Sequence, residues 1–91
     1  MTTNQRAGFQ MSLRALADLV GGDLPARFAE DVSIDSVTID SRHAMPGSLF
    51  VALRGTRHDG HDFIPEAIAR GCSAILAERR LPGLLLPVCR V

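Results

Sequence analysis

Two short runs, residues 49–53 and 73–77, which are apolar except for Ser73, constrain the fold of this chain more than any other feature. Runs this short and this continuous are typical of strands that are buried on both faces of a parallel sheet. The segment between them has apolar residues at helical spacing, at Phe63, Ile64, Ala67 and Ile68. The order of strand, helix and strand with short links predicts a right-handed βαβ crossover between parallel strands.

The ends of this helix are also marked. Asp62 is a candidate N-cap, and Pro65 would lie in the first turn, where proline is tolerated. Gly71 is the expected stop, because glycine readily takes the left-handed conformation that ends many helices. Asp59 is a second candidate cap in the turn that precedes the helix.

A second helix is predicted before the first strand. Ser12 is a good N-cap, Gly21 and Gly22 provide a stop, and an apolar face runs between them through Leu13, Leu16, Ala17, Leu19 and Val20. A helix of this length is marginal alone in water, so we expect it to pack on the sheet. The preceding residues 1–11 are predicted to be a disordered tail, and residues 12–91 a single domain.

Residues 32–39 alternate and are rich in β-branched side chains, which favours a strand. The alternation predicts that Val32, Ile34, Val37 and Ile39 point inward. It slips at Asp35 and Ser36, so a bulge and two short strands both remain open. Leu24 and Phe28, in the preceding connection, are expected to contact the core.

The last apolar segment, 84–91, predicts a strand whose Pro87 favours an edge or a strand start. It ends without a cap or polar tail, which favours a piece of a longer protein. The expected fold is a small single α/β domain with a mostly parallel sheet, a βαβ crossover and an N-terminal helix packed on it.

Charge and composition exclude several functions. The formal net charge is zero, so nothing attracts the domain to nucleic acid or to an anionic membrane. All ten basic residues are arginine, so a phosphate-loop lysine cannot exist within these residues. Cys72 and Cys89 are too few for a disulfide framework and are expected to be reduced and buried in the cytoplasm. No apolar run approaches the ~18 residues that indicate a membrane span.

Three polar residues, Asp40, Ser41 and Arg42, follow the strand of residues 32–39. One interpretation is a polar turn in which Asp40 accepts backbone N–H groups and pairs with Arg42. The other places Ser41 and neighbouring backbone at the C-terminal end of a strand, where α/β sheets bind ligands. Ser41 has no obvious paired base, so it is a poor candidate nucleophile.

The loop 56–61 carries a hydroxyl, a guanidinium and two imidazoles next to a predicted helix. Such groups suit an anion such as phosphate, although a solvated loop is equally consistent with the pattern. His58 and His61 invite a metal-site interpretation, which we disfavour. No third ligand has a suitable spacing, and Gly60 between the histidines indicates a turn.

Four segments, 38–42, 46–55, 59–64 and 67–76, read TIDSR, PGSLFVALRG, DGHDFI and AIARGCSAIL. Their order and spacing closely resemble the N-terminal domain of the Mur ligases, which build the peptidoglycan precursor. The resemblance covers roughly residues 12–91. The helix ending in Leu19, Val20, Gly21 and Gly22 favours the members that add D-alanyl-D-alanine over those that add a diamino acid.

The resemblance implies that the domain binds the uridine diphosphate end of a UDP-N-acetylmuramoyl-peptide. By position, the nucleotide contacts would be Ile39, Ser41, Thr56, Arg57 and His58. The residues expected to support this motif structurally are Asp40, Arg42, Gly47, Gly55, Asp59 and Gly60.

The resemblance also implies what this chain would not do by itself. Family members form an amide bond through an acyl phosphate, using ATP and Mg²⁺ in a central domain. That domain and the C-terminal domain have no counterpart in these residues, so we expect no catalytic residue, cofactor or metal here. The partners would be the UDP-linked peptide and those two domains, in the cytoplasm. The alternative is a free-standing, non-catalytic interaction or scaffold module that retains the fold, and nucleotide affinity separates the two.

Overall fold

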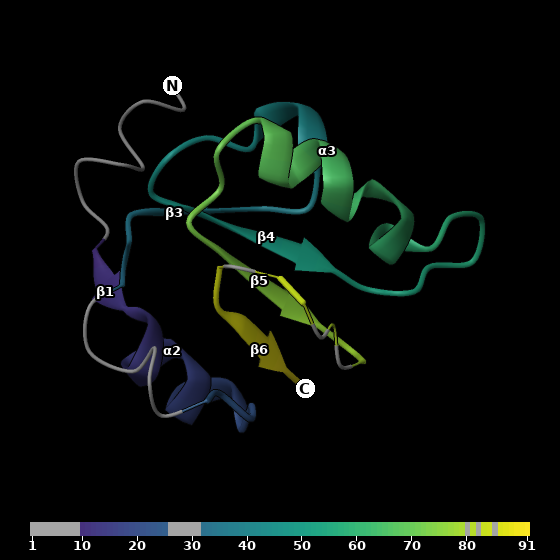
Figure 1. Ribbon diagram of the computed structural model, residues 1–91. Helices are drawn as coiled ribbons and strands as arrows, with labels where there is room; N and C mark the ends of the chain where they lie inside the picture. The colour runs from purple at the N-terminus through teal and green to yellow at the C-terminus, as the bar shows by residue number, and fades with distance from the viewer. Residues whose placement is uncertain (1–9, 26–31, 80, 82, 85) are drawn as a thin grey trace.

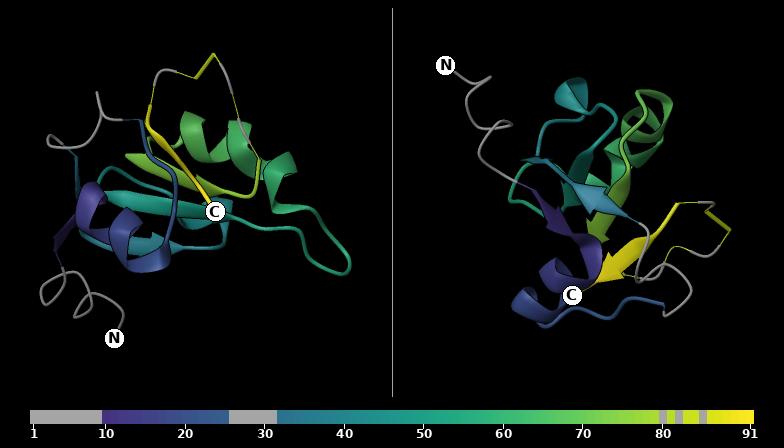
Figure 2. Two further views of the ribbon diagram at one scale, coloured as in Figure 1. Left: turned by 90° about the horizontal axis from the view of Figure 1, so that it is seen from below. Right: turned by 90° about the vertical axis from the view of Figure 1, so that its left-hand side faces the viewer.

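The computed structural model describes residues 10–25, 32–79, 81, 83, 84 and 86–91. Its centre is a parallel sheet of four strands in the order β3 (Ser36–Thr38), β4 (Ser48–Ala52), β5 (Ala74–Ala77) and β6 (Val88–Arg90) (Figure 1). Helix α2 (Leu13–Val20) and helix α3 (Ile64–Ala69) lie on opposite sides of the sheet (Figure 2). This arrangement confirms the predicted α/β fold and its βαβ crossover, in which α3 connects β4 to β5.

The two central strands are buried on both faces, as the apolar runs predicted. Because successive strand residues point to opposite faces, β4 sends Leu49 toward α2 and Phe50 toward α3. Strand β5 alternates in the same way, with Leu76 on the α2 side and Ile75 on the α3 side. The sheet therefore separates two apolar cores, each closed by one helix.

Helix α2 begins and ends where the sequence predicted. The Ser12 hydroxyl accepts a hydrogen bond from the Ala15 N–H at 3.1 Å, and Gly21 has a φ of 69°. The predicted apolar face is too wide, however, because Leu19 is 76% and Val20 is 46% exposed. The sheet is reached only by the face that carries Leu13, Leu16 and Ala17, all of which are buried.

Residues 32–39 form two short strands, which was one of the two options left open. Strand β2 (Ser33–Ile34) pairs antiparallel with β1 (Met11–Ser12), whereas β3 joins the main sheet. Ile34 is buried, as predicted. Residues 1–9 of the predicted tail lie outside the described residues, while Met11 belongs to β1.

The prediction that Val37 and Ile39 point into the core is wrong. They are 51% and 80% exposed. Strand β3 is an edge of the sheet. The α2-side core contains residues of β4, β5 and β6 and none of β3 among the described residues. Exposure does alternate along residues 36–39, as expected of a strand, but among the described residues no helix covers the side of this edge strand on which Val37 and Ile39 lie.

The start of α3 also differs from the prediction. The chain first forms a short 3-10 helix, η3 (Gly60–Phe63), and Asp59 caps it by accepting the His61 N–H at 3.0 Å. Asp62 is therefore not the N-cap of α3, which follows Phe63 without a side-chain cap. Pro65 in the first turn is confirmed, and so is Gly71 as the stop, with a φ of 93°.

At the other edge of the sheet, β6 spans only Val88–Arg90 of the predicted 84–91. Asp23 pairs with Arg90 on the outer side of this strand, through hydrogen bonds of 2.7 and 2.9 Å between their backbone groups. Leu24 is buried beside it, as expected, whereas Phe28 lies outside the described residues. Among the described residues, no helix is long and apolar enough to span a bilayer.

Candidate functional site

The candidate site lies at the edge of the sheet where the parallel strands end. Thr38 of β3 pairs with Phe50 of β4, and Ala52 of β4 pairs with Ala77 of β5, so the segments that follow these strands leave the sheet at the same edge. In α/β sheets, ligands bind outside the carboxyl ends of the strands. Three segments meet that description here: the polar turn (residues 40–43), the hairpin (residues 53–60) and the end of β5 (residues 78 and 79).

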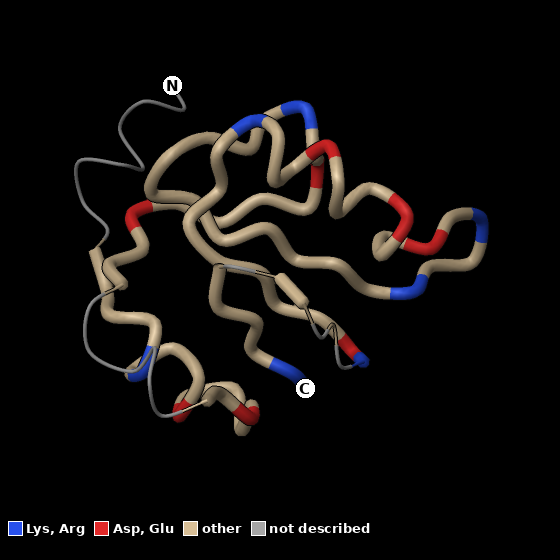
Figure 3. The backbone as a smooth tube through the Cα atoms, in the orientation of Figure 1, with Lys and Arg blue, Asp and Glu red and all other residues tan. Residues whose placement is uncertain are grey.

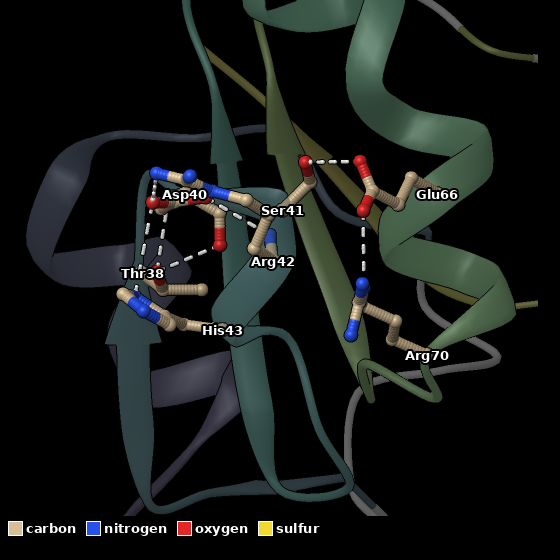
Figure 4. A network of polar contacts seen from close by, with 7 residues as sticks. All are labelled: Thr38, Asp40, Ser41, Arg42, His43, Glu66 and Arg70. Atoms are coloured by element: carbon tan, nitrogen blue, oxygen red, sulfur yellow. Dashed lines mark hydrogen bonds and ion pairs between the residues drawn. The ribbon is translucent and has the colours of Figure 1, made fainter.

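The polar turn is held together by Asp40 (Figure 4). Its carboxylate accepts the Arg42 backbone N–H at 2.9 Å and two guanidinium N–H groups of Arg42 at 3.0 and 2.7 Å. Thr38, at the end of β3, also bonds to the turn, because its hydroxyl accepts the Asp40 N–H at 3.0 Å. These contacts confirm the interpretation of Asp40 as the residue that shapes the turn. The hydrogen bonds from the Arg42 side chain hold the pKa of Asp40 far below its ordinary value.

Ser41 faces the protein interior. It is 6% exposed and donates its hydroxyl to Glu66 Oε1 of α3 at 2.9 Å. The other carboxylate oxygen of Glu66 accepts a hydrogen bond from Arg70 Nε at 3.1 Å. The bonds from Ser41 and then Arg70 lower the pKa of Glu66, so the acceptor stays ionised. Ser41 therefore attaches the short 3-10 helix η2 (Ser41–His43) to α3, and its hydroxyl is already used within the protein.

The groups that the polar turn presents to solvent are different ones. The side chains of Arg42 and His43 are each 74% exposed, and Ile39, directly before the turn, is 80% exposed. Val37 on β3 and Leu53 at the end of β4 add exposed apolar surface, at 51% and 44%. Val37, Ile39 and Leu53, which we call the apolar strip, are thus exposed apolar side chains of β3 and of the segments that directly follow β3 and β4.

The hairpin extends β4 beyond the sheet and projects from the body of the domain (Figure 1). Gly60 donates to the Leu53 carbonyl at 2.9 Å, and Gly55 donates to the His58 carbonyl at 2.8 Å. Only glycine fits at position 60, since a Cβ there would lie 2.8 Å from the Leu53 carbonyl oxygen. The tip of the hairpin is consequently Thr56 and Arg57, both exposed.

Charges of both signs occur along this segment. Figure 3 shows basic and acidic positions following one another over the hairpin and the turn after it, which agrees with the net charge of zero. His58 is exposed, and its ring meets Phe63 edge-on at 6.2 Å between centroids. The guanidinium of Arg57 lies at the hairpin tip, and its N–H groups are suited to donate hydrogen bonds to an anion.

His61 differs from His58 because it is buried. Its side chain is 5% exposed, with Nδ1 on Asp59 Oδ1 at 2.5 Å and Nε2 accepting the Glu78 backbone N–H at 3.1 Å. A neutral imidazole that accepts at Nε2 carries its proton at Nδ1, so it donates to Asp59. Both nitrogens are thus engaged, and the described residues include no group of three potential metal ligands.

The end of β5 contacts both strands of the hairpin. Glu78 Oε1 accepts the Arg54 N–H at 2.8 Å, and Arg79 donates to Asp59 Oδ2 at 3.0 Å. The pKa of Asp59 is lowered, chiefly by the hydrogen bond from the His61 backbone and then by that from its side chain. The two halves of the predicted site therefore depend on different supports: the polar turn on α3, and the hairpin on the end of β5.

Two residues of this network, Glu66 and Glu78, are missing from the site predicted by sequence. His61 is considered there as an anion- or metal-binding side chain of the loop 56–61, and not as a buried support of the hairpin. Glu66 precedes Arg70 by four residues, a spacing that predicts a helical ion pair, and this pair forms. The partner that matters for the site, Ser41, is 25 residues from Glu66. Glu78 is 24 residues from Arg54 and 17 from His61, and no local spacing reveals contacts of that kind.

Comparison with known proteins gives a consistent result. A family profile described as "Mur ligase family, catalytic domain" matches residues 33–81. The UDP-N-acetylmuramoyl-tripeptide–D-alanyl-D-alanine ligase of Escherichia coli K12 is 44% identical over 71 residues, covering 78% of this chain and 15% of that protein. The UDP-N-acetylmuramoyl-L-alanyl-D-glutamate–2,6-diaminopimelate ligase of Caulobacter vibrioides is 53% identical over 64 residues, covering 69% of this chain and 13% of that protein.

A solved structure agrees with these relatives. The crystal structure of MurF from Acinetobacter baumannii superimposes with a TM-score of 0.81 at 28% identity. The match covers 91% of this chain and 18% of that one. The chain therefore spans less than a fifth of the length of each of these proteins.

Proposed function

The chain belongs to the Mur ligase family, and from that premise we propose that it binds the uridine diphosphate end of a UDP-N-acetylmuramoyl-peptide in peptidoglycan synthesis. The observation that carries the proposal is its similarity to two kinds of ligase at once. The names of both kinds share the UDP-N-acetylmuramoyl group, and they differ in the peptide attached to it and in the group that is added. A domain similar to both is expected to recognise the part of the substrate that they share.

The geometry supports this assignment by supplying two kinds of surface. The apolar strip, with Ile39 at 80% exposure, suits the flat face of a uracil ring and its sugar. The hairpin tip offers the Thr56 hydroxyl and the Arg57 guanidinium, with His58 beside them, and these donors suit a diphosphate. Ser41 would act chiefly by fixing the turn that follows Ile39, since its hydroxyl bonds to Glu66.

For the finer identity, we propose a ligase of the D-alanyl-D-alanine-adding type. The fit to the Acinetobacter baumannii MurF structure over 91% of the chain supports this choice over the diaminopimelate-adding type. The described domain would supply substrate binding in the cytoplasm. ATP, Mg²⁺ and the amide-forming chemistry would belong to other domains, which agrees with the absence of lysine from the sequence.

The first test is a titration of the chain with UDP and, separately, with uridine, followed by calorimetry and by NMR of the backbone amides. We expect UDP to shift amides of the polar turn and the hairpin. Ile39→Ala should lower the affinity for both ligands roughly 5–10-fold. The substitution removes three carbon atoms, of which a ring lying on one face of the side chain would cover about half. At about 0.8 kcal/mol per buried CH₂ this loses about 1.2 kcal/mol, and about 1.4 kcal/mol is tenfold in affinity. Arg57→Ala should lower the affinity for UDP and leave the affinity for uridine unchanged.

Leu19→Ala is the matched control for Ile39→Ala, since Leu19 is also an aliphatic residue and is 76% exposed, but on α2. Its affinity for UDP should equal that of the unsubstituted chain. A folded chain that gives no amide shifts with UDP would contradict the proposed function and favour an interaction module that has kept only the fold. Equal losses in Leu19→Ala and Ile39→Ala would contradict the proposed contact surface.

A further inference from the structure

We infer that His61 and Glu78 are positioning residues, which hold the hairpin in the shape that lets its tip contact a diphosphate. The inference rests on the proposed function and adds to it two residues that would not touch the ligand. It follows from the way in which the end of β5 is bonded to both strands of the hairpin.

Glu78 provides the first part of this support. It directly follows Ala77, which is fully buried in the sheet. Its side chain accepts the Arg54 N–H at 2.8 Å, and its backbone N–H is donated to His61 Nε2 at 3.1 Å. A single residue that directly follows a buried strand of the sheet thereby bonds both to the outgoing strand of the hairpin and to His61, which follows the returning strand.

His61 provides the second part by relaying this support to Asp59. The imidazole accepts from Glu78 with one nitrogen and donates to Asp59 with the other. Arg79 donates to the remaining oxygen of Asp59, and Asp59 pairs with Arg54 across the hairpin. The base of the hairpin is therefore bonded on both strands to two consecutive residues, Glu78 and Arg79.

These contacts fit a positioning role better than a ligand-binding role. The His61 side chain is 5% exposed, and the Asp59 carboxylate already accepts bonds from His61 and Arg79. Thr56 and Arg57, at the tip, are exposed. A loop that is ordered before binding loses less conformational freedom when the ligand arrives, so its affinity for the diphosphate is higher.

The test compares Glu78→Ala with Glu78→Gln. Alanine removes the acceptor for the Arg54 N–H, whereas the glutamine amide oxygen can still accept it. We expect Glu78→Ala to speed hydrogen exchange at the Arg54 amide. We also expect it to lower the affinity for UDP roughly tenfold and to leave the affinity for uridine unchanged. Glu78→Gln should restore most of the UDP affinity. Asp18→Ala is the matched control, because it removes an exposed carboxylate from α2.

A second pair of variants separates the two bonds of His61. In His61→Asn the amide can donate to Asp59 from near the position of Nδ1, and in His61→Gln the amide oxygen can accept from Glu78 near the position of Nε2. Each variant keeps one hydrogen bond and loses the other. The affinity for UDP should therefore fall less in each of them than in His61→Ala. Thermal melts identify any variant that fails to fold, and the Glu78 pair then decides the result.

The outcomes distinguish the two proposals. If the unsubstituted chain binds UDP and Glu78→Ala binds it equally well, the positioning role is overturned and the proposed function stands. If the unsubstituted chain does not bind UDP, the proposed function fails, and the role in diphosphate binding fails with it. Unchanged exchange at the Arg54 amide in Glu78→Ala overturns the support of the hairpin in either case.

Discussion

At the scale of single residues, Asp40 and Ser41 are neighbours with opposite roles. Asp40 bonds to Arg42, two residues away, so its contacts arise from the local chain and could be predicted from spacing. Ser41 bonds to Glu66, which only the packing of α3 brings near. The side chain of Asp40 therefore shapes the polar turn, while that of Ser41 fixes the turn to the domain.

The ion pair of Asp40 predicts a pH dependence of stability. The pKa of Asp40 in the folded chain lies far below its ordinary value of 3.8, chiefly because of the Arg42 side chain. A group with a lowered folded pKa stabilises the fold above its unfolded pKa and loses this contribution as the pH falls through the folded value. We expect Asp40→Asn to lower the urea midpoint at pH 7, and this difference to shrink as the pH falls below about 4.

The measurement is a series of urea melts of both chains from pH 7 to pH 2.5. Asp62→Asn is the control, since Asp62 is an exposed carboxylate a few residues from the hairpin. The urea midpoint of Asp62→Asn should stay close to that of the unsubstituted chain over the whole pH range. A difference for Asp40→Asn that is constant over the whole range would show that the ion pair does not contribute to stability.

At the scale of the elements, the sequence identified the strands of the main sheet and the two α-helices better than it identified their ends, and it missed β1, whose Met11 lies in the predicted tail. The apolar run of β4 marks a buried strand whatever surrounds it. The choice between Asp59 and Asp62 as a cap depends on η3, the 3-10 helix of residues 60–63. That turn is held by the contact of His61 with Glu78, a residue that follows β5. A local rule could name both candidates but could not choose between them.

The packing of β4 predicts the cost of removing its aromatic side chain. Phe50 is fully buried between the sheet and α3. Phe50→Ala should lower the free energy of unfolding by about 3–5 kcal/mol, the range for large core aromatics. Phe63→Ala is the control, because Phe63 is 41% exposed and its truncation should lower the free energy of unfolding much less. Urea melts measure both, and a loss below about 1 kcal/mol for Phe50→Ala would contradict this packing.

At the scale of the whole molecule, the two cores lie on opposite faces of the same sheet. Residues that alternate along β4 and β5 contribute to both cores. A defect in the α2-side core should therefore weaken the α3-side core as well. Small domains of this kind usually unfold in one cooperative step.

Leu13→Ala tests this coupling. Leu13 is fully buried on the α2 side, so its truncation should cost about 2–5 kcal/mol. Hydrogen exchange should then accelerate to a similar degree in the most protected amides of β4, β5 and α3, because all of them exchange through global unfolding. Leu19→Ala on the same helix is the exposed control. Faster exchange confined to α2 would show that the two cores unfold independently.

The sequence by itself determined the strands of the main sheet, the two α-helices and the parallel α/β architecture that they form. Apolar runs, helical spacing and the cap at Ser12 depend on neighbouring residues, and they led to a mostly parallel α/β domain with a βαβ crossover and an N-terminal helix packed on the sheet. That the two helices lie on opposite sides of the sheet came only from the structure. The same reasoning located the polar turn and the hairpin, because turn residues and strand ends are marked locally.

Only the tertiary structure decided which side chains are covered and which contacts hold the site together. Val37 and Ile39 have the alternation of buried residues, yet they are exposed because α2 packs over the other strands. Ser41 reaches Glu66, and Glu78 supports the hairpin, across 25 and 24 residues of chain. Such contacts depend on how the elements pack against one another, and that packing is not encoded in the spacing of neighbouring residues.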